Sequence, residues 1–286
     1  MFVRIRLLGT GSPSPSLARM GSSFLIEIES DLILFDFGPG AFHRLMEAGI
    51  KVTQISHLFL THLHYDHCCD YSRLILTRWD QGAGKIPELR VFGPPPLIHM
   101  TEKLFGYDGA FGPDINARIK HKASIDVFRA RGGIGSRKWP MPQVIELRDG
   151  SVTTGNGWTV ITVDVEHVQP YLNCYGYRLD SEEGSIVYSG DTGPCQALRM
   201  LAENCDVLIH MCHYISGREL SIEYKKACAG HLDVAKLASD ANVKNLVLTH
   251  ITEQMDIPSI RERIIEEISE IYEGNLYFGY DLMEIP

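Results

Sequence analysis

Short apolar runs separated by polar or glycine-rich turns fill the amino-terminal part of the chain. Such runs, bounded by turn signals, are typical of buried strands. Two of the intervening segments have the spacing and the stop signals of helices, the first ending at Gly49. We predict strands at 3–8, 23–28, 32–37, 55–60 and 89–92, and helices at 41–48 and 66–79.

The carboxy-terminal part repeats this pattern. Three short strands within 144–168 are separated by Asp149-Gly150 and by the glycine pair at 155 and 157, which predicts a β-meander. We predict further strands at 175–179, 185–188, 207–209, 246–248 and 276–280, and helices at 196–202, 231–241 and 257–272. Alternation of strands and helices predicts mixed β-sheets with helices on their faces. Because both halves give strands and then helices, we expect one α/β (α+β) domain over 1–286, folded as a four-layer αββα sandwich.

The segment from about 101 to 141 interrupts this regularity. It is rich in glycine and carries many basic residues against little acid: Arg118, Lys120, Lys122, Arg129, Arg131, Arg137 and Lys138. We expect an insertion of irregular structure, because long connections of this kind often serve as lids or binding loops. Its basic residues could hold an anionic substrate, RNA or a second subunit, or form a solvated surface.

Composition narrows the class of protein. The 286 residues carry a formal net charge of -9, with a pI near 5.7, which is against a generally basic nucleic-acid coat. No apolar run has the length required to cross a bilayer, and the first residues lack a secretory signal. The seven cysteines form no Cys-x-x-Cys pair, which favours reduced thiols in the cytoplasm.

Four metal-capable side chains directly follow the strand predicted at 55–60: His62, His64, Asp66 and His67. His62 and His64 are two positions apart, so their rings point the same way on an extended strand end. Asp66 and His67 enter the first turn of the helix predicted next and can face a second position nearby. Imidazole and carboxylate ligands in this arrangement suit a pair of borderline metal ions such as zinc.

The same pairing of a strand with a metal-capable residue recurs later, at His167, Asp191 and His250. Each of these residues alone is weak evidence, since a single histidine or aspartate after a strand is often a loop or turn residue. Together with the first cluster they supply two complete ligand sets. Asp36 ends the strand 32–37 and is either a turn former or a carboxylate that orients a metal-bound histidine. We favour the second interpretation.

Several motifs, in their order along the chain, resemble the metallo-β-lactamase superfamily. They are Thr-His-Leu-His-x-Asp-His at 61–67, Ser-Gly-Asp-Thr at 189–192 and Leu-Thr-His at 248–250. The opening Leu-Gly-Thr-Gly-Ser at 8–12, with Phe-Asp-Phe-Gly-Pro-Gly at 35–40, is similar to the ribonuclease Z and arylsulfatase-like branch. The resemblance spans nearly the whole chain except the segment 101–141. It implies an αββα sandwich with two metals in a cleft at one edge of the sheets.

The resemblance also implies roles for individual residues. The first metal would be held by His62, His64 and His167. The second would be held by Asp66, His67 and His250, with Asp191 bridging the two ions. Asp66 would also accept a proton from the attacking water, and Asp36 would orient the histidine loop.

Ribonuclease Z enzymes carry a histidine at the start of a helix before the last Leu-Thr-His, and His231 matches it. The proposed partner of that histidine is a glutamate in a His-Glu-Ala-Thr-like segment. Here the matching stretch is 210–213, and Met211 occupies the glutamate position. Methionine cannot accept the second N–H of a histidine as a carboxylate does. His213 is a substitute partner or a structural residue.

These observations predict a dinuclear metal-dependent hydrolase that uses a metal-bound hydroxide. The expected substrate is a phosphodiester or a small anionic ester or sulfate. One alternative is a tRNA 3′-processing endoribonuclease, with RNA as partner; another is a non-catalytic metal-binding protein. We expect two divalent ions, zinc before manganese or iron, with Asp66 and His231 catalytic, no membrane partner, and a homodimer.

Overall fold

Two β-sheets packed face to face form the centre of the protein. The computed structural model describes residues 3–286. In the order of their pairing the strands of the first sheet are β14 (Glu284–Ile285), β1 (Arg4–Gly9), β2 (Ser23–Ile28), β3 (Asp31–Phe35), β4 (His57–Phe59), β5 (Arg90–Gly93) and β6 (Gln143–Glu146). From β3 to β6 the pairing is parallel, whereas β1 to β3 are antiparallel.

The second sheet has the same mixed character. Its strands, in order, are β13 (Asn275–Phe278), β12 (Asn245–Thr249), β11 (Val207–Met211), β10 (Gly184–Tyr188), β9 (Tyr175–Ser181), β8 (Trp158–Asp164) and β7 (Val152–Thr154). Strands β10 to β13 run parallel, so the loops at their carboxyl ends share one edge of the sheet. The other pairs, from β7 to β10, are antiparallel.

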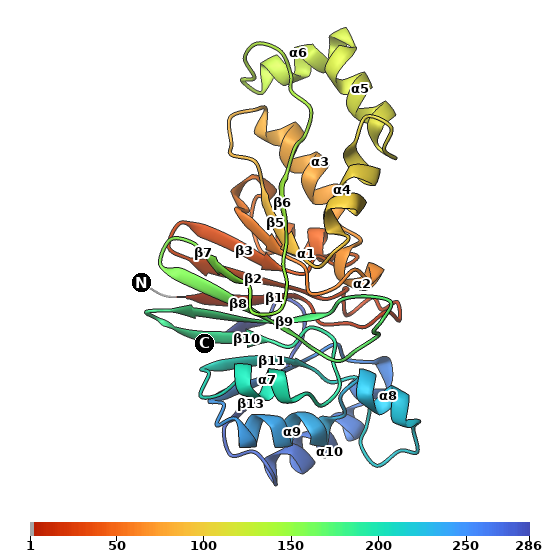
Figure 1. Cartoon of the computed structure of the whole chain (residues 1–286), viewed down its shortest axis with the longest axis vertical. Coiled ribbons are helices and arrows are strands. Elements are labelled where there is room, and N and C mark those ends of the chain that lie inside the picture. The colour runs from red at the N-terminus through yellow and green to blue at the C-terminus, as the bar shows by residue number, and fades with distance from the viewer. Residues whose placement is uncertain (1–2) are drawn as a thin grey trace.

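Helices cover the outer face of each sheet (Figure 1). Those over or beside the first sheet are α1 (Ala41–Glu47), α2 (Tyr65–Cys68), α3 (Tyr71–Gly82), α4 (Leu97–Phe105), α5 (Gly112–Lys120) and α6 (Lys122–Ala130). Those over or beside the second are α7 (Gln196–Leu201), α8 (Ile222–Ala227), α9 (His231–Asp240) and α10 (Pro258–Ser269). Two short 3₁₀ helices, η1 (Val52–Gln54) and η2 (Glu253–Asp256), complete the chain. The predicted αββα sandwich is therefore confirmed.

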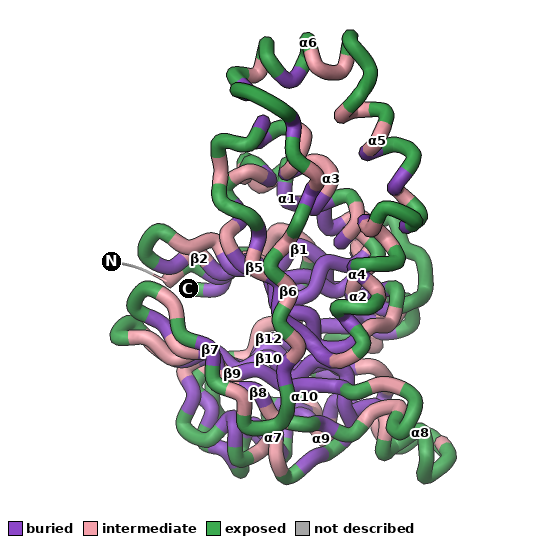
Figure 2. Tube along the Cα trace, turned by 45° about the horizontal axis from the view of Figure 1, so that its top comes forward, coloured by how far each residue is buried: buried purple, intermediate pink, exposed green. Residues whose placement is uncertain are grey.

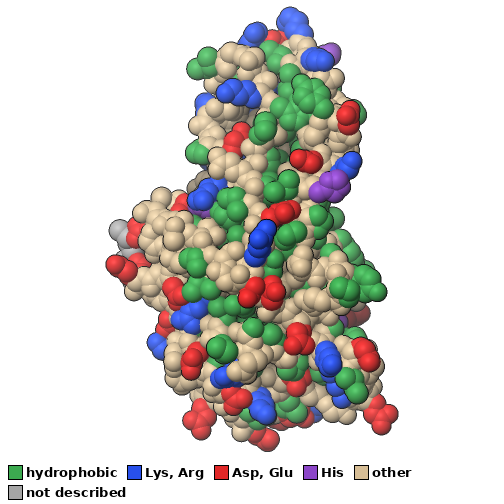
Figure 3. All heavy atoms as spheres, in the orientation of Figure 1, with side chains coloured by type: hydrophobic (Ala, Val, Ile, Leu, Met, Phe, Trp, Pro, Cys, Tyr) green, Lys and Arg blue, Asp and Glu red, His purple; other side chains and the backbone are tan. Residues whose placement is uncertain are grey.

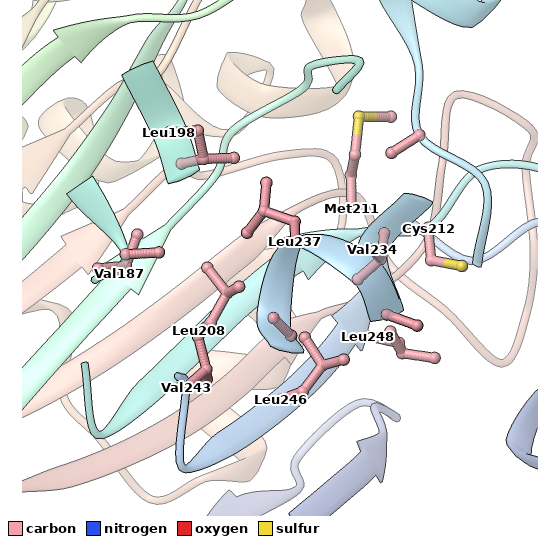
Figure 4. Packing of buried hydrophobic residues seen from close by; sticks show 14 of the residues in the cluster. Val187, Leu198, Leu208, Met211, Cys212, Val234, Leu237, Val243, Leu246 and Leu248 are labelled. Carbon is pink, nitrogen blue, oxygen red and sulfur yellow. The ribbon is translucent and has the colours of Figure 1, made fainter. Parts of the chain in front are cut away.

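Apolar side chains fill the three interfaces between the layers. Buried residues are concentrated along the strands at the centre of the trace (Figure 2). Between the sheets, Phe24 meets Tyr188 edge to face, with ring centroids 4.7 Å apart. Beneath the second sheet, Val234 and Leu237 of α9 pack towards Leu208 and Leu246 of the central strands (Figure 4). Close packing holds the strand ends in fixed positions, and the strand ends position the loops that follow them.

The segment 101–141 is not irregular, as the sequence analysis expected, because most of it is helical. Helices α4, α5 and α6 form an arm that projects from the first sheet (Figure 1). In α4 the buried residues Leu97, Thr101 and Phe105 recur every four positions, which is the period of a helix face. Each of the three helices has nine residues. Glycine-rich turns between such short pieces concealed the helical period in the sequence.

The expected β-meander within 144–168 is also only partly correct. Strands β7 and β8 pair antiparallel as predicted, but β6 lies in the first sheet and pairs parallel with β5. A parallel partner requires a long crossover connection, and the arm of α4, α5 and α6 supplies it. The helix predicted at 66–79 is divided into α2 and α3, and α8 and β14 were not predicted. Among residues 3–286, no helix combines the length and hydropathy that a membrane span requires.

Candidate metal centre

The seven residues that the sequence analysis assigned to metal binding come from strand ends and lie together at one edge of the sandwich. His62 and His64 follow β4, and α2 carries Asp66 and His67. His167, Asp191 and His250 follow β8, β10 and β12 in the second sheet. The ligand atoms fall into two groups, and within each group all of them lie within 4.8 Å of one another. The structure therefore brings all seven residues together.

The first group consists of three imidazoles: His62, His64 and His167. The Nε2 atom of His62 lies 2.9 Å from Nδ1 of His64, and Nε2 of His167 lies 3.4 Å from the same Nδ1. His62 is fully buried, whereas the other two residues are partly exposed. The Nδ1 atom of His167 hydrogen-bonds the backbone oxygen of Ala227, 2.7 Å away, which directs Nε2 towards the group.

The second group has two carboxylates and two imidazoles, all buried: Asp66, His67, Asp191 and His250. Nε2 of His67 lies 3.4 Å from Asp66 Oδ2 and 3.3 Å from Asp191 Oδ1. Nε2 of His250 lies 3.0 Å from Asp191 Oδ2 and 3.4 Å from Asp66 Oδ2. Asp191 Oδ2 is also 3.8 Å from Nε2 of His167, so this carboxylate faces both groups.

The donor atoms of the second group fit a metal ion better than they fit one another. Asp66 Oδ2, His67 Nε2, Asp191 Oδ1 and His250 Nε2 are buried, and none of them makes a hydrogen bond of good geometry. Buried polar atoms are normally paired, so unpaired ones require an explanation. Convergence of unpaired nitrogen and oxygen atoms is the arrangement that a divalent cation satisfies.

Asp36 contacts the candidate ligand His67 on the side of its ring opposite the ligand atom, which agrees with the orienting role predicted from the sequence. Its Oδ2 atom accepts from Tyr188 Oη at 2.8 Å and lies 2.7 Å from His67 Nδ1. Oδ2 also accepts from Thr61 Oγ1, and the other carboxylate oxygen, Oδ1, accepts from the backbone N of Thr61, each at 2.8 Å. Contacts of this kind fix the tautomer and orientation of a ligating histidine. The sequence analysis gave no role to Thr61, the first residue of the motif at 61–67, or to Tyr188, which directly precedes the motif at 189–192.

Two residues of the centre adopt left-handed backbone conformations. The φ angle is 56° at Asp36 and 58° at His250. For residues other than glycine this conformation costs on the order of 1–3 kcal/mol, and it persists where the surroundings fix it. Here the hydrogen bonds of Asp36 fix the first, and the short passage from β12 to the bridge between Ile251 and Gly11 fixes the second.

Electrostatics differ between the two groups. Burial, together with the charge of His67, lowers the pKa of His62, and burial with the neighbouring His167 lowers that of His64. In the second group burial would lower the pKa of His250, but the negative charge of the nearby Asp191 raises it to about 9. Burial would raise the pKa of Asp66, but the neighbouring His250 and His67 lower it well below its usual range. His62 and His64 are therefore neutral at pH 7, whereas the second group contains ion pairs.

His231, expected to be catalytic, does not join either group. It is fully buried at the start of α9, where Nδ1 accepts from the backbone N of Ser216 at 3.1 Å. Nε2 lies 2.5 Å from a carboxylate oxygen of Glu267 on α10. Both ring nitrogens are thus occupied by protein groups. Met211, at the position of the family's glutamate, is buried, and its sulfur lies 2.8 Å from the backbone N of Thr192 (Figure 4).

An αββα sandwich with candidate histidine and aspartate ligands at one edge is typical of the class of metal-dependent hydrolases. A family model described as a beta-lactamase superfamily domain matches residues 32–251. The chain belongs to the metallo-β-lactamase superfamily, in its ribonuclease Z branch, and is a metal-dependent hydrolase. This result is against the alternative of a non-catalytic metal-binding protein.

Individual relatives agree with this assignment. Ribonuclease Z of Mycobacterium sp. (strain KMS) is 33% identical over 253 residues, which cover 87% of this chain and 84% of the relative. The metallo-beta-lactamase fold protein YhfI from Bacillus subtilis superimposes with a TM-score of 0.76 at 16% identity and covers 99% of each chain. The short form of human tRNase Z gives a TM-score of 0.69 at 19% identity, covering 99% of this chain and 98% of that one. The two structures support the fold.

Proposed function

We propose that the protein hydrolyses phosphodiester bonds in a small anionic substrate with two divalent metal ions. The observation that carries this proposal is the convergence of two donor groups on the carboxylate of Asp191. His62, His64 and His167 would hold one ion, and Asp66, His67 and His250 the other. Two such ions, when bound, supply an activated water and a positive clamp for the attacked oxygen.

The residues of the chain have distinct tasks in this proposal. Asp191 would hold both ions at a fixed separation, because it faces both groups. Asp66 is ionised in its surroundings and lies between His67 and His250, so it would serve as a ligand and receive the proton of the attacking water. Zinc is the ion we propose first, although manganese and iron also suit these donors.

A groove of about 660 Å³ borders His167 and supports a small substrate. Its charged lining residues are Asp164, Glu166, Glu223 and Lys226, so acidic groups predominate. A polyanion would be repelled along this wall. The anionic group of the substrate would lie at the metals, and its uncharged or cationic remainder would occupy the groove.

Processing of tRNA 3′ ends is the second candidate, because relatives 33% identical to this chain are named ribonuclease Z. The helical arm supports it in part, since Lys and Arg side chains gather at its far end (Figure 3). However, Arg118, Arg131 and Arg137 all make ion pairs with Asp80, which reduces the positive charge available to RNA. Because of these ion pairs, and because Met211 replaces the glutamate of ribonuclease Z enzymes, we propose tRNA processing only as the second candidate.

The test compares two substrates on the zinc-loaded protein. We expect turnover of bis-p-nitrophenyl phosphate, loss of that turnover and of metal content in His64→Ala, and no change in His99→Ala, a control on the exposed face of α4. Full activity of His64→Ala with one metal lost would refute the two-metal proposal. Cleavage of precursor tRNA at the 3′ junction with a steep salt dependence would instead support the nuclease. The homodimer stays a prediction.

A further inference from the structure

His213 lies in a position that the sequence analysis left open between a structural and a functional role. It follows β11 by two residues, and β11 lies between β10 and β12 in the parallel part of the second sheet. Carboxyl ends of parallel strands share one edge of a sheet, where α/β folds place ligand-binding groups. The loops after these three strands therefore present Asp191, His213 and His250 side by side.

Contacts confirm that His213 belongs to the centre. Its Nδ1 atom lies 2.9 Å from Nδ1 of His250, and the two ring centroids are 4.9 Å apart. The side chain is only partly buried, whereas His231 is fully buried and has both ring nitrogens occupied. Of these two histidines, only His213 contacts a predicted metal ligand and has a partly exposed side chain.

We propose that His213 is a catalytic residue that donates an Nε2–H hydrogen bond to an oxygen of the substrate. The two facing Nδ1 atoms can share only one hydrogen. Nε2 of His250 lies among the candidate metal ligands Asp191 and Asp66. With a metal ion at Nε2, the one hydrogen of this imidazole would be on Nδ1, which would donate it to His213. The remaining hydrogen of a neutral His213 is then on Nε2. A fixed donor beside the metals stabilises charge that develops on a phosphoryl or leaving-group oxygen.

His231 has a different task in this proposal, as a positioning residue for the loop that carries His213. Its Nδ1 accepts from Ser216 N, while Ser216 Oγ accepts from the backbone N of Leu232 at 3.1 Å. The backbone N of His213 donates to the oxygen of Ala229 at 2.9 Å. Tyr214 forms a parallel bridge with Gly230, next to His231. These contacts join the His213 loop to the start of α9.

The experiment compares three substitutions of His213 on the zinc-loaded protein, with His99→Ala as control. The proposal rests on phosphodiester hydrolysis, so kcat and KM are measured with bis-p-nitrophenyl phosphate, and zinc content by elemental analysis. For His213→Ala we expect kcat to fall about 100-fold with unchanged zinc content, the scale of losing one preorganised donor. His213→Gln, whose amide nitrogen can approach the place of Nε2, should recover part of kcat. His213→Asn, which reaches only the place of Nδ1, should not.

Three results would overturn the proposal. One is an unchanged kcat in His213→Ala; another is a loss of zinc that parallels the loss of kcat; the third is recovery by Asn rather than Gln. The last two would mean that His213 only orients His250. For His231→Ala we expect a lower kcat in the parent protein but no further loss in the His213→Ala background, because coupled residues are non-additive. Full additivity would remove His231 as a positioning residue.

Binding of inorganic phosphate separates this proposal from the proposed function. If the wild-type protein turns over no diester, hydrolysis of phosphodiesters fails while the donor role of His213 can still be measured. Calorimetric titration of the zinc-loaded protein should then show phosphate affinity reduced about tenfold in His213→Ala, the equivalent of one hydrogen bond to a charged group. Equal affinities in the variant and the wild type would overturn the donor role.

Discussion

The two ligand groups of the metal centre are built on different principles. The first contains three imidazoles, two of them partly exposed. Among residues 3–286, ring hydrogen bonds to groups outside it join His62 to Thr61 and His167 to the backbone oxygen of Ala227. The second contains two buried carboxylates and two buried imidazoles, and Asp36 contacts one of these imidazoles, His67, from outside the group. His62 and His64 of the first group are neutral donors, whereas ion pairs join the members of the second group.

This difference shows that one chain can form two neighbouring ligand groups that differ in burial and charge. Protonated imidazoles in contact would repel one another, and the lowered pKa values of His62 and His64 avoid this. In the second group, positive imidazoles and ionised carboxylates compensate each other's burial. We therefore expect metal entry to displace protons from the second group but not from the first.

Asp191→Ala should have the largest effect, because it removes the carboxylate that faces both groups. We expect loss of both metals and a fall in diester hydrolysis of about 1000-fold or more, as for removal of one member of a catalytic unit. Elemental analysis and kcat/KM measure this. Asp108→Ala, an exposed aspartate of the arm, is the matched control. Retention of two metals with high activity would contradict the shared role of Asp191.

Asp36→Asn should weaken the second group more than the first, because Asp36 contacts His67 directly and His62 only through Thr61. The amide cannot accept from His67, Thr61 and Tyr188 as the carboxylate does, so the second group loses its support. We expect metal affinity at the second group to fall by about 10–100-fold. The free energy of unfolding should fall by about 1–3 kcal/mol, the range for an unsatisfied buried polar group. Chelator competition and urea denaturation measure the two effects, and equal weakening of both metal groups would contradict this prediction.

Proton release on metal binding is the smallest expected effect, and it distinguishes the protonation states of the two ligand groups. Because the pKa of His250 is raised to about 9, this imidazole is protonated at pH 7 and must lose its proton to bind a metal. Affinity of the second group should therefore rise with pH up to about 9. The first group, whose His62 and His64 have lowered pKa values, should bind with little pH dependence above about pH 7.

Calorimetry of the metal-free protein in buffers of different ionisation enthalpy counts the released protons. Metal binding to His64→Ala, which lacks a ligand of the first group, measures the second group. Metal binding to His250→Ala, which lacks a ligand of the second group, measures the first. We expect proton release at pH 7 in His64→Ala and little in His250→Ala. The reverse distribution would show that the two groups have the opposite protonation states.

The amino-acid sequence by itself determined the sandwich, the strand ends and the seven candidate ligands. Spacing carried that information: His62 and His64 share one side of a strand end, and glycine-rich turns mark where each strand stops. Signals of this kind involve residues close together in the chain, so the sequence alone shows them. The short helices of the arm were not predicted, because each has only nine residues and glycine-rich turns precede α5 and follow α6.

Only the tertiary structure decided which histidine near the last motifs faces the centre. In the sequence, His231 and His213 are both single histidines beside predicted elements. Their roles depend on what other segments place beside them: Glu267 of α10 takes the ring of His231, and the loop after β12 brings His250 to His213. The same holds for the parallel pairing of β6 with β5. Such contacts join residues far apart in the chain, so no local pattern encodes them, and only the folded layers reveal them.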